Sequence, residues 1–502
     1  MKAAIDWADE RRSRYGLLVI LVQSMILAVL VLVAILYPSF NNNPERYIYL
    51  VCVVILILFA WTLWSWRALT GNLFNPYILF MTAAFAFDAG YAFLEIFHLN
   101  TGGIFGGLLP ARITLETLFL VTISLAAFHS GALVAAFTRV GKPRLRRTTQ
   151  KQEQDGRSLR LVGWALIGIA AIPTVLVLKQ YFTAVSSYGY QGLFSQLSPT
   201  GFGAWYRVLA EFLVPGSLFL LAGSKGKRAG IIASSGIIIV FCALMFLLGE
   251  RGSAIVALLV YLWLLHRIIR KVPKIAVAVI AILLIVVLIP SFAIFRSATG
   301  PERYSWARFI DDYRSIKNPA LASLSEMGHQ MVTIAYTIDL VPRTRAYDMG
   351  ASYYYGLLTV FPNLFWNVHP TIARGLQQYW LIENIIPSPR PQIETYTYSF
   401  IAEAYLNFGW WGAPIFLCLL GFLFGSLVLW ADRSSDIARL AMVAAFLVYF
   451  IGLPKAETAL VARGLVWYSV LPYLAVRFLS YARSREREAM SEVPMGPFRT
   501  ED

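Results

Sequence analysis

The stretch AGIIASSGIIIVFCALMFLL at residues 229–248 contains no charged side chain, and the apolar run AIVALLVYLWLL follows it at 254–265. Only the short polar segment Gly249-Glu250-Arg251-Gly252-Ser253 separates them. An α-helix needs about 20 mostly apolar residues to cross the hydrocarbon core of a bilayer. The pair therefore predicts two membrane-spanning helices joined by a tight hairpin, and similar runs recur along the chain.

The composition agrees with this pattern. The 502 residues are 58% hydrophobic and only 14% charged, and the mean hydropathy is +0.62. Soluble domains carry roughly a quarter charged residues, so a soluble enzyme, a disordered scaffold and a coiled coil are excluded. We predict an all-α polytopic membrane protein. Its three cysteines, Cys52, Cys242 and Cys418, lie in apolar runs and show neither a disulfide framework nor metal-ligand spacing.

We predict about twelve membrane-spanning helices. They lie at 16–37, 48–66, 76–97, 113–138, 160–180, 207–223, 229–248, 252–268, 275–295, 410–431, 438–453 and 464–480. Short cytoplasmic loops are enriched in Lys and Arg. The loops on the side of both termini hold 27 of the 43 such residues, so we expect both termini in the cytoplasm. The net charge of +15 is then mainly a topology signal and does not indicate nucleic-acid binding.

The predicted organisation has five parts: a cytoplasmic N-terminus at 1–15, a transmembrane bundle at 16–295 with spans one to nine, a partly helical outer loop at 296–409, spans ten to twelve at 410–480, and a basic cytoplasmic tail at 481–502. The outer loop is too long for a passive connector. We expect the active site there, on short helices at the membrane surface.

Arginines and aromatic residues gather in this outer loop. Arginine presents a planar fork of donors that matches phosphate oxygens and stays charged. We predict that a lipid pyrophosphate is bound by Arg251 of the hairpin and by loop arginines, namely Arg296, Arg343, Arg345 and Arg374. The alternative is that these arginines are solvated and face anionic lipids.

A polar stripe precedes the predicted tenth span. Ser399, Glu403 and Asn407 follow one another at i, i+4 and i+8 and share one helix face. Glu403 could act as a general base, orient an arginine or bind a sugar hydroxyl; a structural salt bridge is the alternative. His329 is a second candidate proton acceptor, because histidine titrates near neutral pH. Asp88, Glu95 and Glu211 are weaker candidates within spans.

No pair of histidines has metal-ligand spacing, and no nucleotide-binding motif is present. We therefore expect no metal and no cofactor.

Three motifs together resemble the bacterial oligosaccharide repeat-unit polymerases, the Wzy-type O-antigen polymerase family. They are Gly-Glu-Arg-Gly-Ser-Ala-Ile at 249–255, Gly350-x-Ser-Tyr-Tyr-Tyr with Phe-Pro-Asn-Leu-Phe-Trp at 361–366, and Ala-Glu-Ala-Tyr-Leu-Asn-Phe-Gly at 402–409. The resemblance implies an enzyme that joins repeat units carried on undecaprenyl pyrophosphate at the periplasmic face of the bacterial inner membrane. It also implies a helical bundle similar to the C-type membrane glycosyltransferases, membrane lipids as surroundings, and a chain-length regulator as a possible partner.

The resemblance also suggests roles for individual residues. Arg251 and the loop arginines would stabilise the leaving pyrophosphate, and Glu403 or His329 would accept the proton of the attacking hydroxyl. The candidate sugar contacts are Tyr353, Trp366, Trp380, Tyr405 and Asn407. Three alternatives stay open: a glycan ligase of the same fold, a flippase or transporter of lipid-linked oligosaccharides, and a non-catalytic docking subunit.

Overall fold

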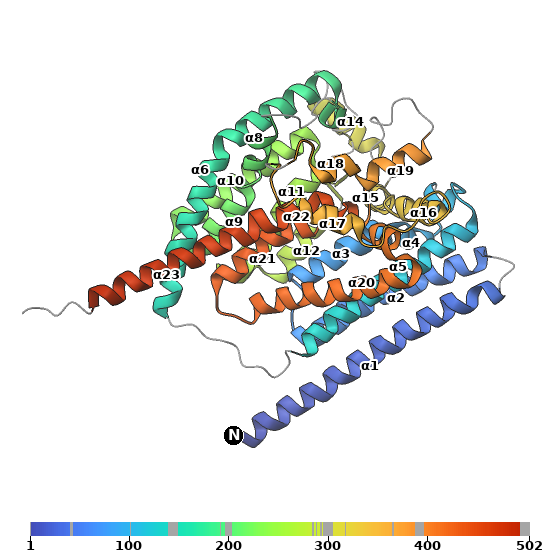
Figure 1. The fold of residues 1–502 in the computed structure, drawn as a ribbon, viewed down its shortest axis with the longest axis horizontal. Helices are drawn as coiled ribbons and strands as arrows, with labels where there is room; N and C mark the ends of the chain where they lie inside the picture. Colours follow the sequence, from blue (N-terminus) through green and yellow to red (C-terminus); the bar gives the residue numbers. More distant parts are fainter. Residues whose placement is uncertain are drawn as a thin grey trace, which may run out of the picture.

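Every regular element in the described part of the chain is a helix (Figure 1). The computed structural model describes residues 2–40, 44–100, 102–138, 149–190, 192–195, 203–283, 286–287, 289–291, 294, 305–316, 318–363, 366–386 and 396–491. Ten helical segments among them are long and apolar enough to cross a membrane. The protein is therefore an all-α, multi-pass membrane protein, as predicted.

Seven of the ten candidate spans lie in single helices and three in helices that are interrupted. The single helices are α1 (Lys2–Phe40), α2 (Glu45–Thr70), α5 (Ala111–Phe137), α6 (Thr149–Tyr188), α10 (Arg228–Leu248), α11 (Arg251–Ile268) and α20 (Phe400–Asp432). The interrupted spans are α8 (Gly203–Ala210) with α9 (Leu213–Gly223), α21 (Ile437–Phe450) with η4 (Leu453–Lys455), and α22 (Thr458–Leu465) with the π-helix η5 (Val466–Val470) and α23 (Leu471–Ser491).

Shorter helices occupy the connections. They are α3 (Pro76–Asp88), α4 (Gly90–Glu95), η1 (Gly103–Gly106), α7 (Gly192–Ser195), α12 (Lys274–Leu283), α14 (Trp306–Ser315), α15 (Pro319–Gly328), α16 (Met331–Leu340), α17 (Ala351–Leu358), α18 (Pro370–Arg374) and α19 (Gln377–Ile385). Helix α15 follows Asn318: the Asn318 side chain accepts the amide N–H of Leu321 and caps the helix.

The centre of the bundle is the pair α5 and α20, which pack against each other more extensively than any other two elements described. Glycines allow this approach. A Cβ atom on Gly421 would lie 1.9 Å from the carbonyl oxygen of Phe128, and one on Gly131 would lie 1.8 Å from that of Cys418. Small residues at such contacts let membrane helices come into backbone contact.

Helices α14 to α19 gather in the upper and right-hand part of Figure 1, whereas the start of α1 and the end of α23 lie toward its left. Helices α14 to α19 therefore form a layer over the end of the bundle opposite the start of α1 and the end of α23. The side of the membrane that each end occupies stays a prediction.

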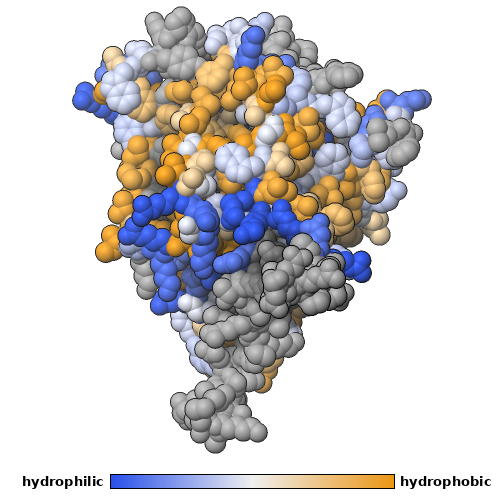
Figure 2. All heavy atoms as spheres, turned by 90° about the vertical axis from the view of Figure 1, so that its left-hand side faces the viewer, coloured by the Kyte–Doolittle hydropathy of each residue, from blue (hydrophilic) through white to orange (hydrophobic). Residues whose placement is uncertain are grey.

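The outer surface carries many apolar side chains. Ile172 is 73% exposed, Phe478 70% and Leu21 57%. Figure 2, which faces the side of α6 and α23, shows broad hydrophobic areas beside a cluster of hydrophilic residues. Soluble proteins seldom expose so much contiguous apolar surface, so this surface suits contact with lipid tails.

Two predicted segments differ in detail from the structure. The predicted span 76–97 is divided into α3 and α4 at Ala89, where Gly90 approaches Gly328 of α15 so closely that a Cβ would lie 2.8 Å from its Cα. The predicted start of span ten at 410 lies inside α20, which begins ten residues earlier at Phe400. Much of 284–295 lies outside the described residues, so the number of twelve spans stays a prediction.

Candidate active site

A break in α20 creates the docking point for the loop that carries the arginines. Gly409 has φ +65° and ψ −162°, a conformation that is open mainly to glycine. The break diverts the carbonyl groups of Leu406 and Asn407 from the helical pattern. They accept the amide N–H groups of Asp348 and Met349 at 2.9 and 3.1 Å. The start of the Tyr353-containing helix α17 is thereby fixed to α20.

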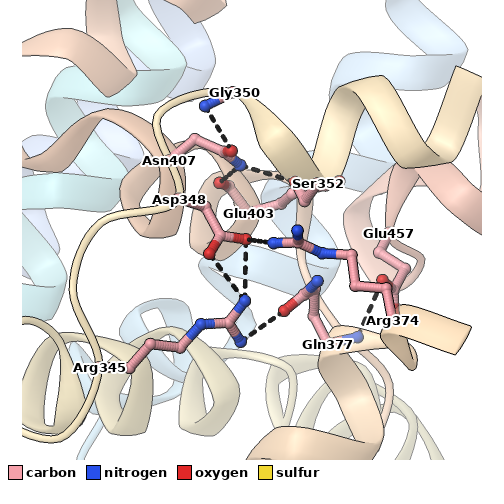
Figure 3. Close-up of polar contacts among 9 residues, drawn as sticks. All are labelled: Arg345, Asp348, Gly350, Ser352, Arg374, Gln377, Glu403, Asn407 and Glu457. Carbon is pink, nitrogen blue, oxygen red and sulfur yellow. Dashed lines mark hydrogen bonds and ion pairs between the residues drawn. The ribbon is translucent and has the colours of Figure 1, made fainter. Parts of the chain in front are cut away.

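Asp348 holds two arginines together (Figure 3). Its carboxylate accepts two hydrogen bonds from Arg345 Nη2, at 2.7 and 2.9 Å, and one from Arg374 Nη2 at 2.5 Å. The Asp348 side chain is only 8% exposed, whereas the two arginine side chains are 23% and 22% exposed. Two cations thus share one anion, and the group has a net positive charge.

Aromatic rings and an amide orient both guanidinium groups further. Arg345 lies 4.8 Å from the centre of the Trp380 ring, and Arg374 lies 4.9 Å from that of Tyr355. Arg345 Nη1 also donates to the Gln377 side chain at 2.8 Å. Cation–π contacts of this kind hold a planar guanidinium in place. These contacts therefore hold two guanidinium groups in fixed orientations, and the N–H donors of a guanidinium match the oxygens of a phosphate.

Glu403 lies directly behind this group and is fully buried. Its Oε1 accepts the Ser352 hydroxyl at 2.8 Å, and its Oε2 accepts the backbone N–H and the hydroxyl of Thr458 at 2.8 and 2.9 Å. Asn407 donates to Ser352 Oγ at 2.7 Å and accepts the N–H of Gly350 at 2.9 Å. Glu403 and Asn407, two residues of the predicted polar stripe, therefore hold α17 and α22 against α20.

Glu457 was missed by the sequence reasoning, although it lies between the last two apolar spans. Its carboxylate accepts the first two amides of α19, from Gln377 at 3.0 Å and Gln378 at 3.2 Å. Burial raises the pKa of Glu457 to about 7; the Gln377 amide lowers it and the charge of Glu403 raises it further. Glu403 and Glu457 thus each satisfy orphan amides at a helix start, where negative charge is favourable.

Arg251 and His329 are not part of the cluster around Asp348; both contact or adjoin helix α15. Arg251 forms an ion pair with Glu326, and its side chain is 13% exposed. His329 follows α15, with its ring Nδ1 3.1 Å from the Tyr91 hydroxyl. Burial of the ring lowers the pKa of His329, and the nearby Glu326 charge opposes this. These contacts link α11, α15 and α4.

The remaining predicted arginines lie elsewhere. Arg343 is 65% exposed and pairs with Asp339 at 2.7 Å, one helical turn earlier. Arg296 lies outside the described residues. Of the four predicted phosphate ligands that the structure describes, only Arg345 and Arg374 are held together in the cluster around Asp348.

The predicted sugar contacts also separate into groups. Trp380 supports Arg345, and Asn407 bonds Ser352 and Gly350. Tyr353 stacks on Phe416 and Phe408. The Tyr405 hydroxyl donates to the carbonyl of Val341 at 3.2 Å, and Trp366 packs edge-on against His369. Among the described residues, no three His, Cys, Asp or Glu side chains are arranged to hold a metal ion.

Comparison with known proteins gives one match. The family model described as O-antigen polysaccharide polymerase Wzy matches residues 19–485, which is nearly the whole chain. No curated protein sequence and no solved structure matches at a significant level.

Proposed function

The chain belongs to the O-antigen polysaccharide polymerase Wzy family, and from this premise we propose that it joins undecaprenyl-pyrophosphate-linked repeat units at the periplasmic face of the bacterial inner membrane. Members of this family polymerise lipid-linked repeat units into O-antigen, so the protein is a membrane glycosyltransferase. Membership favours a polymerase over the ligase, the flippase and the docking subunit.

The observation that carries the site assignment is the cluster of Arg345, Asp348 and Arg374. In the proposed reaction, a hydroxyl oxygen of the acceptor repeat unit attacks the anomeric carbon of the donor saccharide. The bond from that carbon to the pyrophosphate oxygen breaks, lipid pyrophosphate leaves, and the proton of the attacking hydroxyl passes to water. The two guanidinium groups, oriented before the substrate binds, would stabilise the negative charge on this leaving group. One such preorganised contact contributes roughly 3–4 kcal/mol to the transition state.

We propose that the two arginines supply this neutralisation without a metal ion. Asp348, Glu403 and Glu457 are positioning residues in this scheme. Asp348 holds the two arginines, Glu403 holds α17 against α22, and Glu457 holds the start of α19, whose Gln377 contacts Arg345.

Substitution of the two arginines tests the site. In cells that carry Arg345→Ala or Arg374→Ala, we expect surface glycolipid with single repeat units and little long polymer, measured by gel profiles of the polysaccharide. Arg343→Ala is the matched control, because Arg343 lies on the same segment but is exposed and pairs with Asp339. Immunoblots check that all variants are expressed. Normal polymer lengths in both test variants would reject the proposed pyrophosphate site.

The class of reaction is tested separately by deletion. A cell without a repeat-unit polymerase still carries single repeat units on its surface glycolipid. A cell without the ligase carries none, and a cell without the flippase accumulates lipid-linked units on the inner side of the membrane. Only the first outcome agrees with the proposed function.

A further inference from the structure

The candidate span Trp205–Gly223 is broken in its interior, between α8 and α9. The sequence explains the break. Pro215 has no N–H, so it cannot bond to the carbonyl of Glu211, four residues earlier. The N–H of Phe212 bonds to Leu209 at 3.2 Å in place of Val208. Two carbonyl groups, those of Glu211 and Val208, therefore lose their usual helical partners.

Two tyrosines from the last third of the chain replace those partners. The Tyr449 hydroxyl donates to the Glu211 carbonyl at 3.3 Å, and the Tyr468 hydroxyl donates to the Val208 carbonyl at 2.8 Å. Their rings stack, with centroids 5.1 Å apart. Tyr468 belongs to the π-helix η5, and π-helical turns occur frequently at functional sites. The break is thus supported by α21 and η5.

Charged side chains surround this break. Glu211 is exposed although it belongs to a candidate span. Arg463 of α22 lies close enough to act on Glu211, Tyr449 and Tyr468 through its charge. In the part of the chain described here, Arg463 forms no ion pair with Glu211 within 4 Å. Arg207 of α8 lies 6.0 Å from the Tyr181 ring, which is also near Glu211.

An exposed carboxylate would be costly if it faced lipid tails, and ionisable residues at this depth usually face water, a partner or a substrate. Broken helices in membranes are likewise tolerated where they line a polar space. The exposed Glu211 and the half-buried Arg463 therefore indicate polar surroundings at this position and not lipid tails.

The α8–α9 break is close to the cluster of Arg345, Asp348 and Arg374. Thr458, at the start of α22, bonds to Glu403, and Arg463 lies five residues later on the same helix. Five residues advance a helix by about 7.5 Å. The start of α22 thus contacts the residues behind the Arg345–Asp348–Arg374 cluster, while its last turn faces the broken helix.

We propose that the α8–α9 break, with Glu211, Arg207 and Arg463, binds the headgroup of the second lipid-linked repeat unit, the acceptor. This inference rests on the proposed function, which assigns the donor pyrophosphate to Arg345 and Arg374. The arginines at the break bind the acceptor's pyrophosphate, which stays attached during the transfer, and Glu211 accepts hydrogen bonds from its saccharide hydroxyls. α22 separates the two headgroups.

The test uses the purified full-length protein in lipid nanodiscs with two modified substrates. A donor-only substrate lacks the attacking hydroxyl, and an acceptor-only substrate carries a methylene group in place of the anomeric oxygen, so its pyrophosphate cannot leave. We expect Arg463→Ala and Glu211→Gln to raise the KM for the acceptor about ten-fold, as for a lost charged hydrogen bond. The KM for the donor should stay within about two-fold. For Arg374→Ala we expect the reverse: a higher KM for the donor and a KM for the acceptor within about two-fold of the original value.

Lys225→Ala is the matched control, because Lys225 is an exposed cation that follows α9 and lies outside the candidate spans, and we expect both KM values to be unchanged. Thermal melting of each variant checks folding, and Arg463→Lys provides a second variant that keeps the charge; we expect a smaller acceptor effect from it. Unchanged acceptor KM in Arg463→Ala and Glu211→Gln, or an equal rise for both substrates, would overturn the acceptor site. If Arg374→Ala also leaves the donor KM unchanged, the proposed donor site fails instead.

Discussion

Glu403 illustrates how much a single buried carboxylate can organise. It is fully buried, and it accepts three hydrogen bonds from two residues on different helices. A carboxylate so completely bonded has little free capacity to accept a proton from a substrate hydroxyl without losing one of these contacts. Its geometry therefore supports a positioning role more strongly than the role of general base.

Glu403→Gln tests this distinction. The amide NH₂ of glutamine cannot accept, so either the Ser352 hydroxyl or the Thr458 donors lose their acceptor. An unsatisfied buried donor costs about 1–3 kcal/mol. We expect a lower melting temperature together with shorter polymers. Loss of polymer with an unchanged melting temperature would instead identify Glu403 as the base.

Glu457 gives a prediction for pH. Its pKa is raised on folding, from 4.5 to about 7. A carboxyl group with a raised pKa stabilises the folded state fully below the unfolded value, and this contribution is lost as pH rises through about 7. The melting temperature should therefore fall between about pH 5 and pH 8, by the equivalent of up to roughly 3 kcal/mol.

Glu457→Gln serves as the comparison for this slope, because glutamine keeps the size of the side chain but does not titrate. We expect the variant's melting temperature to depend less on pH across the same range. If the melting temperatures of the two proteins fall equally with pH, Glu457 does not titrate in this pH range.

The sequence predicted part of this site. The spacing of Ser399, Glu403 and Asn407 placed them on one face, and arginines were expected in the outer loop. The partners could not be predicted, because Ser352 and Thr458 are 51 and 55 residues from Glu403 in the chain. For the same reason, nothing in the sequence distinguished Arg345 and Arg374 from Arg343.

At the scale of elements, helices were easier to predict than their breaks. Long apolar runs require helices in a membrane, because every backbone group must be bonded internally. The break at Gly409 exposes the carbonyl groups to which Asp348 and Met349 bond, and the sequence gives no local signal for these tertiary partners. The break at Glu211 does have one, since the pattern Glu211-x-x-x-Pro215 removes the helical bond of its carbonyl.

The contact between α5 and α20 gives the prediction at this scale. Gly421→Ala would place a methyl group 1.9 Å from the Phe128 carbonyl oxygen. The helices would have to separate, and overpacking of this kind costs about 1–3 kcal/mol. We expect reduced expression and a lower melting temperature, and weaker polymerisation because α20 carries Glu403 and Asn407.

Gly236→Ala in α10 is the matched control for Gly421→Ala, because a Cβ there meets no atom within 4 Å. Alanine is the better helix former, by about 1 kcal/mol, so this variant should melt at the same or a higher temperature. Equal effects of the two substitutions would exclude the close α5–α20 contact as the cause.

At the scale of the whole molecule, helices α14 to α19 lie at the end of the bundle opposite the start of α1 and the end of α23 (Figure 1). Lipid-linked saccharides have apolar tails in the bilayer and polar headgroups at its surface. A layer of short helices over the bundle end, with arginines on α18 and before α17, places charge at the level of those headgroups. The proposed function requires this layer to lie on the periplasmic face of the membrane.

The side of the membrane can be tested with introduced cysteines. Tyr354 of α17 is 61% exposed, and Arg485 of α23 is also exposed. With a membrane-impermeant maleimide added to spheroplasts, we expect Tyr354→Cys to be labelled and Arg485→Cys to react only after permeabilisation. The unsubstituted protein is the control, because Cys52, Cys242 and Cys418 lie within candidate spans. The reverse pattern would place the arginine cluster in the cytoplasm and contradict periplasmic polymerisation.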